Sequence, residues 1–196
     1  MHFWDGGDAD GWPKIGPMTI KLLMLCSVFM AAFFASRGAS AQQVTKAEVP
    51  GVTNFAKLET TIACAGATKP EAVPAIKEMG YKSIINLRLA DENGANVDQE
   101  AIAAKNAGIR FLHIPFNGAQ PDPKVADDFL MAVKDPQNMP AFIHCASGNR
   151  VAAMWMIKRM VVDKWDAEKA GNEATQLGLT NQALKKFAVE YADSHK

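Results

Sequence analysis

The stretch Pro140–Ile157, "PAFIHCASGNRVAAMWMI", joins a short apolar run to a helical pattern through a polar loop. Its first part is an apolar run from Pro140 to Ile143 that ends in His144 and Cys145, as in a strand that is buried on both faces. Gly148 lies in the loop and permits a backbone turn that residues with a Cβ resist. From about Val151 onward, apolar side chains recur at helical spacing. The stretch therefore predicts a buried strand, a tight loop and a helix.

The rest of the chain repeats this alternation of short apolar runs and helical patterns. Expected strands are 58–66, 82–88, 109–116 and 140–145. Expected helices are 70–80, 97–108, 122–135, a segment from about 151, 166–178 and 181–192. Strands that alternate with helices predict an α/β fold with a central, largely parallel sheet flanked by helices. We expect the last helices to form a C-terminal helical cap.

The segment "MTIKLLMLCSVFMAAFFASRGASAQQ", residues 18–43, has the layout of a secretory signal. Lys21 comes first, an apolar run follows from Leu22 to Ala35, and Ala39-Ser40-Ala41 supplies small residues for cleavage. The alternative is a membrane anchor, but the run is shorter than the roughly 18–20 apolar residues that span a bilayer. We therefore expect a periplasmic or secreted protein with no stable membrane insertion after cleavage.

This interpretation divides the chain into four parts. Residues 1–17 are an upstream extension, 18–41 the signal peptide, 42–53 a linker and 54–196 the catalytic domain. Acidic and basic residues balance at 21 each, and no basic stripe stands out, so nucleic acid is not an expected partner. No His, Cys, Asp or Glu cluster has metal-ligand spacing, so neither a metal nor another cofactor is expected.

Cys145 closes a predicted central strand, and in such sheets the chemistry lies beyond the carboxyl ends of the strands. Arg150 begins the next helix, whose free N–H groups point into the loop. Together they form a cradle for an oxyanion. The same field favours thiolate over thiol, and such positions lower a cysteine pKa from about 8.5 to roughly 3.5–7.5. Cys145 is therefore predicted to be a nucleophile at the floor of an anion pocket.

Six further residues are candidates for binding the substrate. His144 can orient the loop, the loop residues can donate to a bound anion, and Arg88 ends a predicted strand at the same edge of the sheet. An equal alternative for Arg88 is a surface ion pair with Asp91 or Glu92. The six are His144, Ala146, Ser147, Gly148, Asn149 and Arg88.

The motif "HCASGNR", with "INLR" and "HIPF" upstream, resembles the cysteine-dependent tyrosine and dual-specificity phosphatases. It is most similar to the bacterial phosphatase-like domain of beta-lactamase-hydrolase-like proteins, over roughly Asn54 to Leu179. The resemblance implies that Cys145 attacks phosphorus to give a phosphocysteine, which water then hydrolyses. It implies that Arg150 clamps the phosphoryl oxygens. The expected partner is a phosphorylated small molecule or a phosphoprotein.

Three positions depart from the family pattern. Four residues separate Cys145 from Arg150 where the family has five, and Val151 replaces a hydroxyl residue that helps the sulfur to leave. Asn117 stands near the place of the general-acid aspartate, so Asp122 is the nearest acidic candidate for a catalytic acid. Its alternative role is to cap the helix that follows.

Two alternatives to a phosphatase remain. The spacing C-x-x-G-x-R is also similar to the active loop of rhodanese-like sulfurtransferases, in which a persulfide would form on Cys145. A catalytically weak anion-binding protein is the other. Removal of the signal leaves only Cys64 and Cys145 as cysteines. The resemblance places Cys64 beside the active loop as a possible redox partner, with an inert packed thiol as the alternative.

Overall fold

The structure, a computed structural model, describes residue 2 and residues 43–59 and 61–195. The expected upstream extension and signal segment, residues 1–17 and 18–41, therefore lie outside the described residues apart from residue 2. Of the two compact units into which the chain divides, the second, residues 41–196, contains every element discussed below. Within the described part, no helix has the length and apolar character needed to cross a bilayer.

A mixed sheet, parallel over four of its strands, forms the centre of the molecule. Its strands lie in the order β1-β2-β3-β6-β4-β5. Strands β3, β6, β4 and β5 are parallel, whereas β1 and β2 are antiparallel to their neighbours. The largely parallel sheet predicted from the sequence is confirmed. The strands are β1 (Val44–Lys46), β2 (Ala56–Leu58), β3 (Ile62–Ala65), β4 (Ser83–Asn86), β5 (Arg110–His113) and β6 (Ala141–His144).

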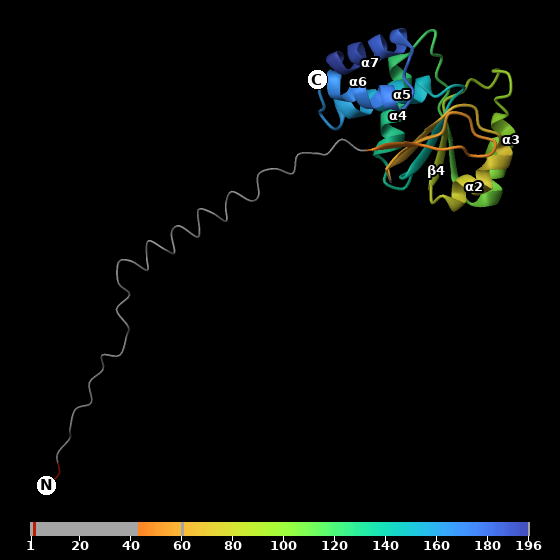
Figure 1. Ribbon diagram of the computed structural model, residues 1–196, viewed down its shortest axis with the longest axis horizontal. Helices are drawn as coiled ribbons and strands as arrows, with labels where there is room; N and C mark the ends of the chain where they lie inside the picture. Colours follow the sequence, from red (N-terminus) through yellow and green to blue (C-terminus); the bar gives the residue numbers. More distant parts are fainter. Residues whose placement is uncertain (1, 3–42, 60, 196) are drawn as a thin grey trace. The chain divides into compact units, whose positions relative to one another are not determined.

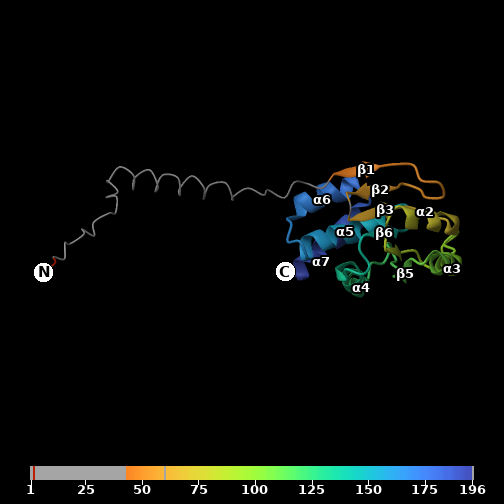
Figure 2. The ribbon, with the colours of Figure 1, turned by 90° about the horizontal axis from the view of Figure 1, so that it is seen from below.

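Helices cover both faces of the sheet, which explains why its central strands are buried along their whole length. Phe142 of β6 packs with the cluster under η2, α2 and α3, and Ile143 packs with the cluster under α4 to α7. Figure 1 shows these two groups of helices on opposite sides of the strands, and Figure 2 shows the same layers from below. The helices are η2 (Pro70–Ala72), α2 (Val73–Glu78), α3 (Val97–Ala107), α4 (Pro123–Lys134), α5 (Asn149–Val161), α6 (Ala167–Gln176) and α7 (Gln182–Ser194).

The structure corrects the expected elements at the N-terminal side of the domain. The single strand expected over 58–66 is in fact the end of β2, a turn and β3, because Glu59 takes a positive φ of 45° and the Thr61 N–H donates to the Leu58 carbonyl. Residues 44–46, expected to lie in a linker, instead form the edge strand β1, in which Val44 pairs with Leu58. Three residues of mixed polarity carry too little periodicity to indicate a strand.

Candidate active site

Cys145 follows the last residue of β6, a strand with a parallel neighbour on each side. Its N–H donates to the Ala65 carbonyl of β3 at 3.2 Å, and the residue is fully buried. The chain then turns through Gly148, whose φ of 96° lies in the region that favours glycine. Helix α5 begins at the next residue, and the Gly148 N–H donates to the Cys145 sulfur at 3.1 Å. The sulfur therefore lies at the positive end of a helix, as the sequence predicted.

Arg150, in the first turn of α5, donates hydrogen bonds to three residues from two other loops. Its Nη1 donates to Glu92 Oε1 at 2.5 Å, to the Phe116 carbonyl at 2.9 Å and to the Leu87 carbonyl at 3.2 Å. Its Nη2 donates to Glu92 Oε2 at 2.8 Å. Burial alone would lower the pKa of Arg150, but its contacts with Glu92 and Cys145 raise that pKa above its ordinary value. The guanidinium is therefore a fixed cation beside the sulfur.

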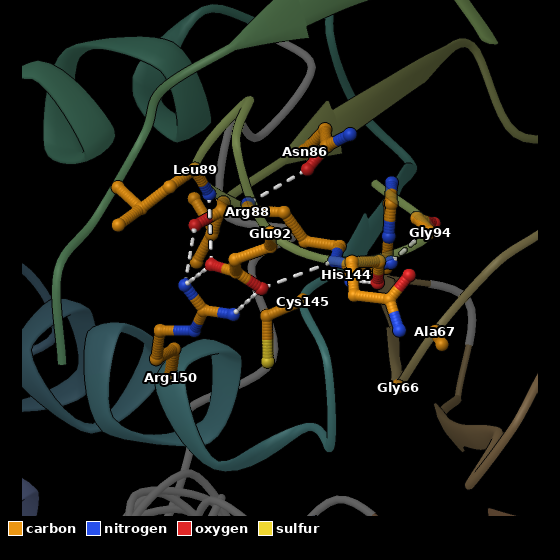
Figure 3. Close-up of polar contacts among 12 residues, drawn as sticks. Gly66, Ala67, Asn86, Arg88, Leu89, Glu92, Gly94, His144, Cys145 and Arg150 are labelled. Carbon is orange, nitrogen blue, oxygen red and sulfur yellow. Dashed lines mark hydrogen bonds and ion pairs between the residues drawn. The ribbon is translucent and has the colours of Figure 1, made fainter. Parts of the chain in front are cut away.

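Glu92 is the functional residue that the sequence analysis did not recognise as part of the cradle. Burial would raise the pKa of this carboxyl group, but hydrogen bonds from Arg150, the Leu89 N–H and Arg88 lower it to about 2. Figure 3 shows the carboxylate between the two arginines, close to the Cys145 side chain. A group with this pKa is ionised near neutral pH, so Glu92 orients Arg150 and is no proton donor. Its only signal in the sequence was the spacing of four residues from Arg88.

Arg88 is buried and is engaged by the loop that carries Glu92. Its Nε donates to Glu92 Oε2 at 3.2 Å, its Nη1 to the Gly94 carbonyl at 2.7 Å and its Nη2 to the Asn93 carbonyl at 2.6 Å. Of the two roles considered for Arg88, the structure shows the pair with Glu92, although that pair is part-buried and lies within the site. Arg88 shapes the loop over residues 89–94.

His144 lies on the opposite face of the sheet from the cluster that contains Cys145. Its ring contacts Phe142, and its Nε2 lies 3.1 Å from Glu100 Oε2. Adjacent residues of a strand point to opposite faces, which explains this placement. The side chain of His144 therefore does not reach an anion over the Cys145 sulfur, and its expected role in orienting the loop stays a prediction.

Asn149 and Ser147 connect the loop to its surroundings. Asn149 Oδ1 accepts hydrogen bonds from the Thr180 and Asn181 N–H groups at 2.8 and 2.9 Å, so this side chain fixes the turn between α6 and α7. The Asn54 side chain donates to the Ser147 carbonyl at 3.1 Å. Ser147 and Asn149 also line a cavity of about 980 Å³, together with Lys46, Ala47, Glu48, Val49, Pro50, Val52, Asn54, Phe55, Ala56, Leu177, Gly178 and Thr180.

The segment before α4 places no carboxyl group in contact with Cys145. Asp122 is exposed and accepts a hydrogen bond from the Lys124 N–H at 2.9 Å, which is the geometry of a helix cap. Asn117 is exposed, and its side chain accepts from the Ala119 N–H at 3.0 Å. Between them, Gly118 passes so close to Arg150 that a Cβ there would lie 3.3 Å from the Arg150 Cγ.

Cys64 lies in β3, the neighbour of β6, and is fully buried. Its thiol contacts the Gly148 carbonyl at 3.6 Å, while the N–H of the same Gly148 contacts the Cys145 sulfur. Burial raises the pKa of the Cys64 thiol, and the nearby Cys145 raises it further. Both cysteines are free thiols in this structure.

Comparison with known families decides between the chemistries that such a cradle could support. Residues 39–191 match the model of the family described as DSP-PTPase phosphatase fused to NAD+ kinase. The chain belongs to this family. It is therefore an enzyme of the tyrosine and dual-specificity phosphatase superfamily, a phosphoric monoester hydrolase, and the resemblance seen in "HCASGNR" is confirmed. No curated protein matches the chain.

Solved phosphatase structures share the fold of this family member. TpbA from P. aeruginosa is 19% identical and superposes with a TM-score of 0.59, over 82% of this chain and 94% of that one. A putative phosphatase (DUF442) from Shewanella putrefaciens CN-32 is 16% identical, with a TM-score of 0.63 over 75% and 96%. The core catalytic domain of the PP-IP phosphatase Siw14 from S. cerevisiae is 20% identical, with a TM-score of 0.60 over 74% and 88%. At these identities the likeness shows the fold.

Proposed function

We propose that this phosphatase hydrolyses phosphate monoesters through a phosphocysteine on Cys145, and that it does so outside the cytoplasm after loss of residues 1–41. The single observation that carries the chemistry is the placement of the Cys145 sulfur, 3.1 Å from the Gly148 N–H at the start of α5 and beside a fixed Arg150. The start of α5 and the Arg150 guanidinium each favour a thiolate on Cys145 and a bound oxyanion next to it.

In the first step, the Cys145 thiolate attacks phosphorus in line with the leaving oxygen. An S–P bond forms as the P–O bond breaks, and the electron pair leaves with the oxygen. Arg150 has donors left for this step, since its Nε contacts no carbonyl or carboxylate among the described residues. Those donors and the loop N–H groups hold the phosphoryl oxygens.

In the second step, water attacks the phosphocysteine. A new P–O bond forms, the S–P bond breaks, and the thiolate and inorganic phosphate are released with a proton passed to solvent. Val151 offers no hydroxyl group to the departing sulfur, so the Gly148 N–H is the donor that stabilises it. The Gly148 N–H thus takes the role that the resemblance assigns to a hydroxyl residue after the arginine, which is to help the sulfur to leave.

The proposed substrates are phosphate esters whose leaving groups need little protonation. General acid catalysis is worth about 10²–10⁴-fold. Asp122 is engaged as a helix cap, and the low pKa of Glu92 keeps that group ionised, so neither residue supplies it. Aryl phosphates, including phosphotyrosine in a protein, and small phosphorylated molecules with weakly basic leaving groups fit this condition. Two structural neighbours support these substrate classes. One is TpbA with a Cys-to-Ser change in complex with phosphotyrosine, and the other is a PP-IP phosphatase.

The test compares three chains that begin at residue 42: the parent, Cys145→Ser and Arg150→Lys. We expect the parent to hydrolyse an aryl phosphate, Cys145→Ser to be inactive and Arg150→Lys to be strongly impaired, because lysine cannot replace the planar fork of the guanidinium. Hydrolysis by Cys145→Ser at the parent rate would contradict the proposal. Turnover of thiosulfate with cyanide, in place of aryl phosphate, would indicate the sulfurtransferase alternative.

A further inference from the structure

Glu100 of α3 is a buried carboxyl group that neither the sequence motifs nor the proposed chemistry explains. It is fully buried under the sheet, where an acidic side chain is costly unless it is well partnered. Its partners are two residues at the carboxyl ends of adjacent strands, His144 of β6 and Asn86 of β4. Asn86 Nδ2 donates to Glu100 Oε2 at 2.7 Å. His144 Nε2 lies 2.9 Å from Oε1 and 3.1 Å from Oε2.

The contacts of Asn86 extend this group toward the catalytic arginine. Its Oδ1 accepts a hydrogen bond from the Arg88 N–H at 2.7 Å, which fixes the backbone just after β4. Arg88 then holds the loop over residues 89–94, and Glu92 in that loop holds Arg150. Figure 3 shows Asn86, Arg88, Glu92 and Arg150 in this sequence.

One continuous set of contacts therefore joins the two ends of the catalytic loop. It begins at His144, immediately before Cys145, passes through Glu100, Asn86, Arg88 and Glu92, and returns to Arg150. We infer that Glu100 is a positioning residue for the reaction: it sets the place of Arg150 relative to the Cys145 sulfur, although it touches neither. The inference rests on the proposed function of the Cys145 site.

Glu100→Gln tests this inference, because it keeps the size of the side chain but removes its charge. It also leaves one acceptor oxygen where the carboxylate of Glu100 contacts both Asn86 Nδ2 and His144 Nε2. Glu173→Gln is the matched control. Glu173 is also a buried carboxyl group on a helix, and it binds Arg159 Nε at 2.6 Å and Trp155 Nε1 at 2.9 Å. Arg159 lies nine residues further along α5 than Arg150, away from the loop.

The first readout is the rate of Cys145 alkylation by iodoacetate divided by the rate with iodoacetamide. The Arg150 guanidinium attracts anionic iodoacetate but not neutral iodoacetamide, so the ratio reports whether Arg150 is correctly placed beside Cys145. It needs no hydrolysis and responds little to a general loss of stability. We expect Glu100→Gln to lower the ratio severalfold and to lower kcat/KM for an aryl phosphate about tenfold, mainly through KM. Glu173→Gln should leave both unchanged.

An unchanged alkylation ratio in a folded Glu100→Gln chain would overturn the inference, as would equal effects of Glu173→Gln. If Glu100→Gln does not fold, Asn86→Ala decides, since it interrupts the same path and leaves the Glu100–His144 contact. A lowered ratio in Asn86→Ala supports the inference, and an unchanged one overturns it. If the parent hydrolyses no phosphate ester, the proposed function fails, while the alkylation ratio still decides the role of Glu100.

Discussion

Glu92 and Arg150 form the closest charged contact in the site, and each depends on the other for its orientation. Glu92→Gln keeps the shape but removes the charge that holds both terminal nitrogens of Arg150. We expect kcat/KM for an aryl phosphate to fall by about tenfold or more, because a misplaced clamp loses transition-state contacts. Steady-state kinetics against the parent measures this, and a variant with parental kcat/KM would show that Arg150 is placed without Glu92.

The same pair predicts how stability depends on pH. The pKa of Glu92 is lowered in the folded chain to about 2, below the ordinary value near 4.5. Its contribution to stability is therefore fully present above pH 4.5 and is lost as pH falls toward 2. Urea unfolding of the parent and Glu92→Gln should show the largest difference in free energy at neutral pH and a shrinking one between pH 4.5 and 2. A difference independent of pH would contradict the assignment.

Asp122 offers a test of whether the reaction has an acid on this chain. Asparagine caps helices about as well as aspartate but cannot donate a carboxyl proton. We expect Asp122→Asn to keep both the thermal midpoint and kcat for alkyl and aryl phosphates, and Asp122→Ala to cost about 1 kcal/mol of stability. A fall of kcat in Asp122→Asn that is larger for alkyl than for aryl phosphates would instead identify Asp122 as the acid.

At the scale of elements, β3 and β6 bring the two cysteines of the domain to adjacent strands. Mild peroxide should oxidise the Cys145 thiolate to a sulfenic acid, releasing water, and attack by Cys64 would then form a disulfide and release a second water. Without Cys64 to trap it, the sulfenic acid of Cys64→Ser goes on to the irreversible sulfinic acid when a second peroxide molecule oxidises it and is reduced to water. After such longer exposure to peroxide, we expect a reductant to restore the activity of the parent and not of Cys64→Ser. Intact mass after oxidation checks this: a loss of two hydrogens supports the pair, whereas two remaining titratable thiols contradict it.

The elements that could be predicted from the sequence are those whose signal is local. The segment from β6 to α5 was recognisable because strand, glycine turn and helix start follow one another within Pro140–Ile157. The roles of Glu92 and Glu100 were not, because their partners lie 58 and 44 residues away along the chain. A carboxyl group in a loop and another on a helix look like ordinary surface residues until the fold brings Glu92 to Arg150 and Glu100 to His144.

At the scale of the whole molecule, the catalytic domain accounts for the chain only from residue 41 onward. We expect the native host to export the protein and remove residues 1–41, as the layout of residues 18–41 indicates. Intact-mass analysis of protein from the cell envelope and from the medium measures this. A mass that still includes Leu22–Ala35 would mean that the apolar segment is kept as an anchor.

The three residues that hold Arg150 also affect the thermodynamics of recognition. An arginine side chain carries about 2 kcal/mol of rotamer entropy. Here that freedom is already lost when Glu92, Leu87 and Phe116 engage the guanidinium on folding. An arriving oxyanion therefore meets a preorganised donor, and calorimetry of vanadate binding should show only a small entropic penalty.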